Sequence, residues 1–355
     1  MARHKKLIAI DLFAGIGGIR LGLEKAGFNV VFSSDIDTYC KQTFDQNHKE
    51  KLILKDIKEI DSSEIPEHDL LAGGFPCQPF SMAGHRRGFD DERGHLFFEI
   101  KRILKDKQPR AFLLENVKHL EKHNGGATFD RIKNILENEL GYKVFYKILN
   151  SKNFGLAQSR PRIYIVGFKN HDIKFNFPDP LTLTPPPIST ILEKGDIEDW
   201  YYLSQKYYEG LIKHKERHRK KGHGFGFNIL EPTDISYALV VGNMGRERNL
   251  IKDVVKPWFY KGGNQKSGIP NSDGVRRLTI KECSRLQGLP ENFTFPVSKT
   301  QAYKQIGNSV AIPVIEAIAK VIKKALYLEE KTINKDEFVK DKLQEFFIPY
   351  TPSPI

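Results

Sequence analysis

The chain has 355 residues, enough for one large domain and a smaller one or for two comparable domains, and its 39% hydrophobic and 28% charged residues are typical of a globular protein. Lysine and arginine exceed aspartate and glutamate by 56 to 44, so the net charge is +12 and a polyanionic partner such as nucleic acid is favoured. The three cysteines are too few and too widely spaced for a disulfide framework or a CxxC metal site.

The first residues, MARHKKLIAIDLFAGIGG, begin like a secretory signal peptide, with basic residues before apolar ones. Asp11 interrupts the apolar run and no small-residue cleavage site follows it, so we interpret the segment as a first strand. No apolar stretch of the chain approaches the roughly 20 residues that span a bilayer. We therefore expect a cytoplasmic protein that does not enter a membrane.

Up to residue 170, short apolar segments alternate with amphipathic helical patterns. Strands are predicted at 6–13, 29–35, 68–75, 110–117 and 162–168, and helices at 18–28, 36–48 and 94–107. This alternation predicts an α/β fold with a mostly parallel sheet and helices on both faces.

The pattern changes at residues 177–190, FPDPLTLTPPPIST, which form a proline-rich linker. Residues 190–275 are irregular, aromatic, rich in glycine and locally basic. Regular patterns return at 276–290 and at 302–328, and the second of these predicts one long amphipathic helix.

The segment DLFAGIGG, residues 11–18, predicts a strand that enters a glycine turn and then a helix. Such a turn lies at the carboxyl edge of an α/β sheet, where glycines allow the backbone to approach a ligand. Asp35, at the end of the second strand, is placed to accept hydrogen bonds from ribose hydroxyls. Arg20 stands where a dinucleotide fingerprint has its third glycine, so an adenosyl ligand is favoured over a nicotinamide. A plain tight turn with a helix-capping aspartate is the alternative.

The segment GGFPCQPFS, residues 73–81, presents Cys77 between two prolines that stiffen the loop. A thiolate is a nucleophile, and nearby positive charge favours it over the thiol. The residues that follow supply such charge through Arg86, Arg87 and Arg93. We interpret Cys77 as a catalytic nucleophile at the carboxyl edge, with an inert thiol as the alternative.

A carboxylate and two arginines are predicted at the same edge. Glu115 ends the strand at 110–117 and can donate a proton if burial raises its pKa. Arg160 and Arg162 precede the strand at 162–168, and one of them can orient Glu115 or hold a substrate oxygen. A surface salt bridge is the alternative.

We assign no catalytic or metal-binding role to the remaining cysteines or to the clustered histidines. Cys40 and Cys283 lie within helical patterns among apolar neighbours, which is typical of core cysteines. His214, His218 and His223 have no carboxylate or cysteine beside them at a spacing that suits a metal. We therefore predict no metal site.

Taken together, the motifs resemble those of the DNA (cytosine-5) methyltransferases of the bacterial restriction–modification type. DLFAGIGG, GFPCQPFS, ENV, QSRPRIYIVGF, RRLTIKECSRLQG and YKQIGNSV follow the family's order and spacing over residues 7–170 and 274–325. The resemblance implies a Rossmann-like, S-adenosylmethionine-binding catalytic domain at 1–180 that is completed by 300–328. It also implies a smaller target-recognition domain at 181–299 and a C-terminal tail at 329–355, with DNA in the cleft between the domains.

The resemblance also implies a role for each matching residue. Cys77 would attack C6 of a flipped-out cytosine, Glu115 would engage N3, and Arg162 would hold the O2 side of the ring. The methyl group would pass from S-adenosylmethionine to C5. The cofactor site would consist of Phe13, Gly15, Gly17, Asp35, Ile36, Asp56, Ile57, Pro76, Asn308 and Ser309.

Contacts to DNA are implied for Ser81, Arg93, Arg160 and His223, and the last of these is a candidate to fill the space that the flipped base leaves. The basic run at 213–221 is expected to contact phosphates, with a solvated helix face as the alternative. Ala238 precedes Leu239 where the family often has a Thr-Leu pair, so a hydroxyl contact near the target phosphate is missing.

The expected partners are double-stranded DNA, through which the protein would associate with the nucleoid, and a cognate restriction endonuclease. A monomer suffices for the chemistry. A tRNA cytosine-5 methyltransferase of the same fold is the first alternative, although its Cys-Phe-Thr signature is absent from the middle segment. A non-catalytic DNA-binding regulator is the second, and Cys77, Glu115, Arg162 and Asn308 argue against it.

Overall fold

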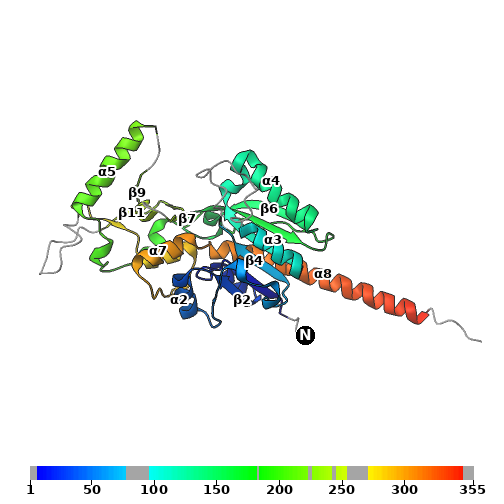
Figure 1. Cartoon of the computed structure of the whole chain (residues 1–355). Helices are drawn as coiled ribbons and strands as arrows, with labels where there is room; N and C mark the ends of the chain where they lie inside the picture. Colours follow the sequence, from blue (N-terminus) through cyan, green and yellow to red (C-terminus); the bar gives the residue numbers. More distant parts are fainter. Residues whose placement is uncertain are drawn as a thin grey trace, which may run out of the picture.

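A seven-stranded sheet forms the centre of the computed structural model, which describes residues 6–76, 96–181, 184–222, 226–241, 245–253 and 271–346 (Figure 1). The strand order is β3-β2-β1-β4-β5-β8-β6. The strands are β1 (Ile8–Leu12), β2 (Asn29–Asp35), β3 (Ile53–Leu54), β4 (Leu70–Gly74), β5 (Ala111–Val117), β6 (Lys143–Asn150) and β8 (Pro161–Phe168). Strands β1 to β5 pair in parallel, whereas β8 is antiparallel to both β5 and β6. The predicted mostly parallel α/β sheet is confirmed.

Strand β6 was not predicted. It forms the edge of the sheet, where only β8 pairs with it. Most of its residues are half-buried or exposed, so its sequence, KVFYKILN, lacks the continuous apolar run that marks a buried strand.

Helices cover both faces of the sheet, and the alternation of side chains along the strands separates two hydrophobic clusters. The helices are α1 (Gly18–Lys25), α2 (Thr38–Asn47), α3 (Leu96–Lys107), α4 (Ala127–Asn134) and α8 (Ile312–Phe346). One cluster joins α1 and α8 to one sheet face through Ala9 and Leu113. The other joins α3 and α4 to the opposite face through Ile10 and Phe112. Adjacent residues of one strand therefore belong to different hydrophobic clusters.

The C-terminal segment departs from the prediction of one helix at 302–328. It forms α7 (Lys299–Asn308) and α8, which are separated by residues 309–311. Pro313 has no backbone N–H to donate to the carbonyl of Ser309, so a continuous helix is interrupted here, while proline is tolerated in the first turn of α8. Helix α8 then continues to Phe346, so secondary structure does not break at residue 329, where we expected the tail to begin.

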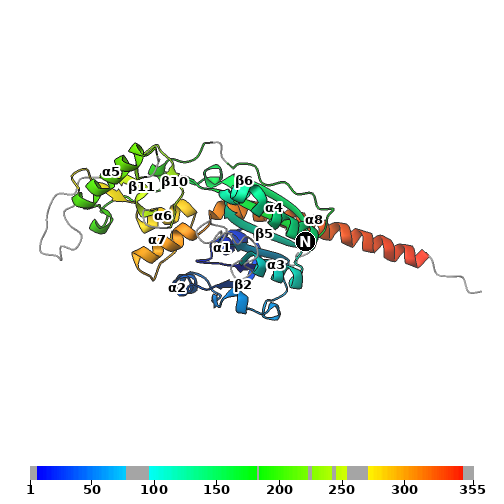
Figure 2. The ribbon, with the colours of Figure 1, turned by 45° about the horizontal axis from the view of Figure 1, so that its top comes forward.

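Helix α8 folds back across the sheet and packs closely against α1, and its last turns extend away from the other elements (Figures 1 and 2). A side chain on Gly22 would place its Cβ 2.6 Å from the Cβ of Ile315, so glycine allows this close approach. Lys323 donates a hydrogen bond to the carbonyl of Ala26 at 3.0 Å. Despite its length, α8 is not apolar enough to cross a bilayer, and neither is any other helix in the described part of the chain.

A second group of elements lies at the end of the sheet away from the tip of α8 (Figure 2). It contains the helices α5 (Gln205–Lys220) and α6 (Ile280–Gln287) and the three-stranded sheet β12-β11-β9. These strands are β9 (Asn228–Leu230), β11 (Asn249–Lys252) and β12 (Val275–Arg277). The short strand β10 (Ser236–Tyr237) pairs in parallel with β7 (Gln158–Ser159), which directly precedes β8. This pairing attaches the second group to the central sheet.

The packing of α8 on α1 predicts opposite effects for two glycine substitutions. Gly22→Ala should lower the free energy of unfolding by about 1–3 kcal/mol, because the added methyl group overlaps Ile315. Gly210→Ala in α5, where no described atom lies within 4 Å of the added Cβ, should raise it by about 0.5–1 kcal/mol. Urea unfolding of both variants checks this, and a Gly22→Ala protein as stable as the wild type would contradict the packing argument.

Candidate active site

The carboxyl ends of the parallel strands bring the predicted site residues to one edge of the sheet. Leu12, at the end of β1, is paired with Gly73 of β4, and Gly74 is paired with Glu115 of β5. The turn after β1 and the exit from β4 therefore lie beside the end of β5. Ligands bind at this edge in open α/β sheets.

The turn after β1 has the backbone conformation that its glycines predict. Gly15 and Gly17 have φ angles of 56° and 84°, in the left-handed region that side chains disfavour. A Cβ on Gly17 would lie 2.3 Å from the His48 ring, and one on Gly18 would lie 2.6 Å from Oγ of Ser309. Hence the first turn of α1 packs directly on the junction between α7 and α8.

Asp35 holds this turn in place from the end of β2. One carboxylate oxygen accepts a hydrogen bond from the amide of Gly15 at 2.8 Å, and the other accepts from the amide of Asp37 at 2.9 Å. Burial raises the pKa of this carboxyl. The two backbone bonds fix its orientation and leave further acceptor capacity on each oxygen.

The other residues predicted for the cofactor surround the same turn. Ile36 is 65% exposed, and Asn308 is exposed at the end of α7. Asp56 and Ile57 follow β3, whose last residue is paired with Asp35, and the Asp56 side chain accepts a hydrogen bond from the amide of Lys58 at 3.0 Å. The remaining members of the set are the half-buried Phe13, whose φ is 57°, the exposed Pro76 and the nearly buried Ser309.

Glu115 and Arg162 form a nearly buried ion pair. Nε of Arg162 lies 3.2 Å from Oε1 of Glu115, and their side chains are 14% and 11% exposed. The two residues share a face because Glu115 is paired with Tyr164 of β8, two positions from Arg162. Burial raises the pKa of Glu115, and the charges of Arg162 and Arg160 oppose this effect. The carboxyl therefore retains a proton to higher pH than an exposed glutamate does.

Cys77, Ser81, Arg93 and His223 lie outside the described residues. The chain that leads to Cys77 is described as far as Pro76, and the side-chain amide of Asn116 donates to the carbonyl of Phe75 at 2.9 Å. A Cβ on Gly74 would lie 3.4 Å from Oε2 of Glu115. The approach to the cysteine loop thus passes beside the carboxyl group. Our sequence analysis gave Asn116 no role, although its position next to Glu115 was a signal.

The structure corrects the expectation that Arg160 contacts DNA. Its side chain is buried, with the residue only 3% exposed, and its guanidinium donates to three backbone carbonyls. The acceptors are Leu239 at 2.6 Å, Gly307 at 2.9 Å and Ser309 at 2.7 Å. This side chain joins segments of the protein to one another and is not presented to a nucleic acid.

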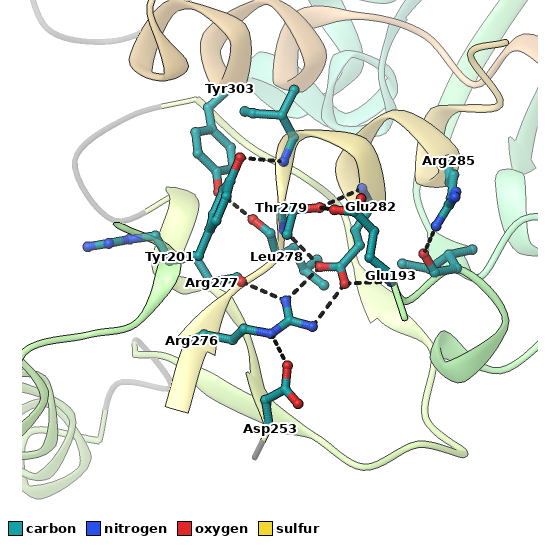
Figure 3. Close-up of polar contacts among 12 residues, drawn as sticks. Glu193, Tyr201, Asp253, Arg276, Arg277, Leu278, Thr279, Glu282, Arg285 and Tyr303 are labelled. Atoms are coloured by element: carbon teal, nitrogen blue, oxygen red, sulfur yellow. Dashed lines mark hydrogen bonds and ion pairs between the residues drawn. The ribbon is translucent and has the colours of Figure 1, made fainter. Parts of the chain in front are cut away.

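The motif RRLTIKECSRLQG, to which the sequence analysis gave no individual role, forms a buried polar network in the second group of elements (Figure 3). Arg276 and Glu282 are 1% and 0% exposed at the side chain and form two parallel hydrogen bonds of 2.8 and 2.9 Å. Asp253 contacts the same guanidinium, and the amide of Glu193 donates to Glu282 at 3.0 Å. Glu282 also completes a capping box with Thr279 at the start of α6. The network joins the segment around Glu193 to β12 and α6.

Helix α5 carries the predicted basic run at the end of the molecule opposite α8 (Figure 1). Lys213, Lys215, Arg217 and Arg219 are exposed along it. His214 and His218 lie on one face of α5, with ring centroids 4.3 Å apart.

Of the two cysteines that were predicted to be structural, Cys40 is half-buried and Cys283 is buried.

Comparison with known proteins agrees with this arrangement. Residues 7–324 match the model of the family described as C-5 cytosine-specific DNA methylase. The chain is 46% identical over 324 residues to the Type II methyltransferase M.HpaII of Haemophilus parainfluenzae, with 90% of each protein covered. It is 44% identical over 319 residues to the Type II methyltransferase M.NlaX of Neisseria lactamica, which covers 89% of this chain and 96% of the relative.

Two solved structures share the fold at low sequence identity. The Entamoeba histolytica methyltransferase EhMeth superimposes with a TM-score of 0.71 and 21% identity, covering 91% of this chain and 99% of the other. The S. pombe Dnmt2 methyltransferase gives a TM-score of 0.71 and 20% identity, with 90% and 99% covered. Together with the family match and the bacterial relatives, these findings confirm the resemblance seen in the motifs. The chain belongs to the C-5 cytosine-specific DNA methylase family and is a DNA cytosine-5 methyltransferase.

Proposed function

We propose that the enzyme transfers a methyl group from S-adenosylmethionine to C5 of a flipped-out cytosine within a specific duplex sequence. The reaction passes through a covalent bond between Cys77 and C6. The observation that carries this proposal is the nearly buried pair of Glu115 and Arg162, which lies beside the entrance to the Cys77 loop. Desolvation of both charges is costly, so the burial of this pair at the edge where ligands bind supports a role in the reaction.

The chemistry follows from the weak nucleophilicity of cytosine C5. Addition of the Cys77 thiolate to C6 moves electrons toward C5 and divides one difficult step into easier ones. A protonated Glu115 donates to N3 as negative charge develops on the ring, and Arg162 donates to O2. When bound, S-adenosylmethionine supplies the electrophilic methyl group that C5 takes. Loss of the C5 proton to a base then expels Cys77 and restores the aromatic ring.

The target base must leave the stack before a side chain can reach C6. Ala238 stands where the family often has a threonine, so one hydroxyl contact near the target phosphate is missing from this enzyme. The cleft that receives the DNA is proposed to lie between a catalytic domain at 1–180, completed by 300–328, and a recognition domain at 181–299. We expected the tail to begin at residue 329, but Glu329 and Glu330 pair with Arg110 of the proposed catalytic domain, so we propose that only the later residues, which continue α8 as far as Phe346, lie outside both domains.

The residues around the glycine turn fit an adenosyl ligand. No described atom lies within 4 Å of a Cβ built on Gly15, so there is open space beside the turn. Next to it, Ile36 offers an apolar surface that is 65% exposed, and Asp35 retains acceptor capacity. An apolar surface suits a purine, and a carboxylate accepts hydrogen bonds from ribose hydroxyls. Ile36 and Asp35 would therefore hold the adenosine, with Phe13 and Asn308 at its sides.

The Type II methyltransferases among the relatives suggest the biological role. We propose that this enzyme likewise acts as the modification partner of a restriction endonuclease, protecting the sequence that the nuclease cleaves. It is proposed to act in the cytoplasm on double-stranded DNA.

A covalent trap tests the proposed reaction. In DNA that contains 5-fluorocytosine, C5 carries fluorine where the departing proton would be, so the enzyme should remain bound through Cys77. Tritiated S-adenosylmethionine should label this adduct, and Cys77→Ser should abolish it and reduce turnover on ordinary DNA by about three orders of magnitude or more.

Cys40→Ser is the matched control, because Cys40 is half-buried in α2 and should leave the adduct intact. Undiminished methylation in Cys77→Ser would overturn the covalent mechanism. Label that enters tRNA and not DNA would overturn the proposed substrate.

Asp11 lies beneath the glycine turn and gives stability a pH dependence. It is fully buried, accepts a hydrogen bond from the amide of Arg20 at 3.1 Å, and burial raises its pKa from 3.8 to about 8. Between pH 3.8 and about 8, Asp11 therefore stays protonated in the native state but is ionised in the unfolded state. Because the unfolded state binds fewer protons, the free energy of unfolding decreases as the pH rises toward 8.

Asp11→Asn should remove this contribution and retain the acceptor for Arg20. We expect the free energy of unfolding of the variant, relative to the wild type, to increase progressively between about pH 5 and pH 8. Urea titrations at several pH values measure the difference, and a difference that stays constant with pH would exclude this role for Asp11.

The exposed basic residues of α5 predict the salt dependence of DNA binding. Replacing Lys213, Lys215 and Arg217 with glutamine should reduce the slope of log affinity against log salt by about 0.9 for each phosphate that the variant no longer neutralises. The control replaces Lys105, Lys320 and Lys324, which are also exposed but lie on α3 and α8. An unchanged slope in the α5 variant, measured by fluorescence anisotropy, would assign the basic run to a solvated helix face.

A further inference from the structure

We propose that Arg160 is a positioning residue that couples DNA binding to cofactor binding. It does so by joining the segment around Leu239, in the recognition part, to the turn at Gly307–Ser309 beside the cofactor. This inference rests on the proposed function and concerns how its two ligands affect one another.

One guanidinium holds both segments at once. A terminal nitrogen of Arg160 donates to the carbonyl of Leu239 at 2.6 Å. The other terminal nitrogen donates to Gly307 at 2.9 Å and to Ser309 at 2.7 Å. A guanidinium is planar and rigid, so the three acceptors have a fixed relative geometry. A shift of Leu239 therefore changes the bonds available to Gly307 and Ser309.

The two acceptors near the cofactor are available because of the local sequence. Gly307 lies in the last turn of α7, where carbonyls have no partner within the helix. Pro313 has no N–H with which to satisfy Ser309. Both carbonyls are buried with their residues, so they require a donor from elsewhere in the fold. Arg160 meets that requirement for both.

A second set of contacts fastens the recognition segment to the same place. The amide of Leu239 donates to the side chain of Gln158 at 2.9 Å, two residues before Arg160. Gln158 in turn donates to the carbonyl of Leu286 at 2.7 Å. A Cβ on Gly307 would lie 2.8 Å from Cγ2 of Val241, so the segment rests directly on the end of α7.

The ends of this connection lie beside both proposed ligands. Ser309 contacts Gly18 in the first turn of α1, and the neighbouring Asn308 is exposed in the cofactor site. On the other side, Val240 and Val241 are 36% and 44% exposed next to Leu239. Arg160 is also two residues from Arg162 along the chain. Binding of DNA at the segment around Leu239 thus affects the turn at Gly307–Ser309 through Arg160. Thermodynamic linkage requires that cofactor binding change the affinity for DNA by the same factor.

The test measures the affinity for S-adenosylhomocysteine by calorimetry, with and without saturating sonicated genomic DNA. In the wild type we expect DNA to tighten binding by about fivefold or more. In Arg160→Met, which keeps an unbranched apolar stem and loses every donor, the ratio of the two dissociation constants should fall to about one. Arg160→Lys, with fewer donors but the same charge, should give an intermediate ratio.

The control for a general loss of stability is Arg110→Met. Arg110 also joins distant segments, because it donates to the carbonyl of Leu326 at 2.8 Å and pairs with Glu329, but it lies at the amino end of β5, away from the site. It should lower the melting temperature and leave the coupling ratio unchanged. Gly307→Ala offers a second route, because its methyl group pushes against Val241 without removing a donor, and it should also lower the ratio.

Three outcomes would overturn the inference. The first is a wild-type ratio of one while the same preparation transfers tritium to DNA, which leaves the proposed function intact. The second is a ratio in Arg160→Met and Gly307→Ala that equals that of the wild type. The third is an equal fall of the ratio in Arg110→Met, which would assign the effect to lost stability. Absence of tritium transfer by the wild type would overturn the proposed function itself, and the inference with it.

Discussion

Parallel pairing of β1, β2, β4 and β5 is the constraint on which the rest of the site depends. Because these strands run in one direction, the glycine turn, Asp35 and Glu115 all lie at the edge where the strands end. Antiparallel β8 then brings Arg162 back to the same edge, two positions from the residue paired with Glu115. The site thus combines residues that are far apart in sequence, because the strand order brings their ends together.

Buried charges are concentrated where segments from different parts of the chain meet. Glu115 pairs with Arg162 at the end of the sheet, Arg276 pairs with Glu282 in the second group of elements, and Arg160 joins carbonyls of residues 239, 307 and 309. A buried ion is costly unless its partners are well placed, so such groups stabilise one arrangement over near alternatives. This explains why arginine, with its fixed fork of donors, occupies all three positions.

The C-terminal segment packs on the first helix although it lies about 300 residues from the first strand. Gly22 allows α8 to approach α1, and Gly18 allows Ser309 to reach the first turn of that helix. The junction between α7 and α8 matters as much as the two helices, because the last turn of α7 and the interruption that follows it supply the carbonyls of Gly307 and Ser309 that Arg160 binds. Glycines and one proline thus allow the two ends of the chain to meet at this edge of the sheet.

Local patterns were enough to predict β1, β2, β4, β5, β8 and the helices α1, α2 and α3, because strand–turn–helix units depend on neighbouring residues, but α4 was not predicted. They also identified the glycine turn, whose left-handed φ angles few other residues adopt. Strand β6 and the buried role of Arg160 could not be read in this way. The pattern of an edge strand is weak, and QSRPR shows an arginine without showing whether it faces solvent or carbonyls from residues 239, 307 and 309. Which charges are buried is decided only when distant segments pack together, since burial depends on neighbours that the local sequence does not contain.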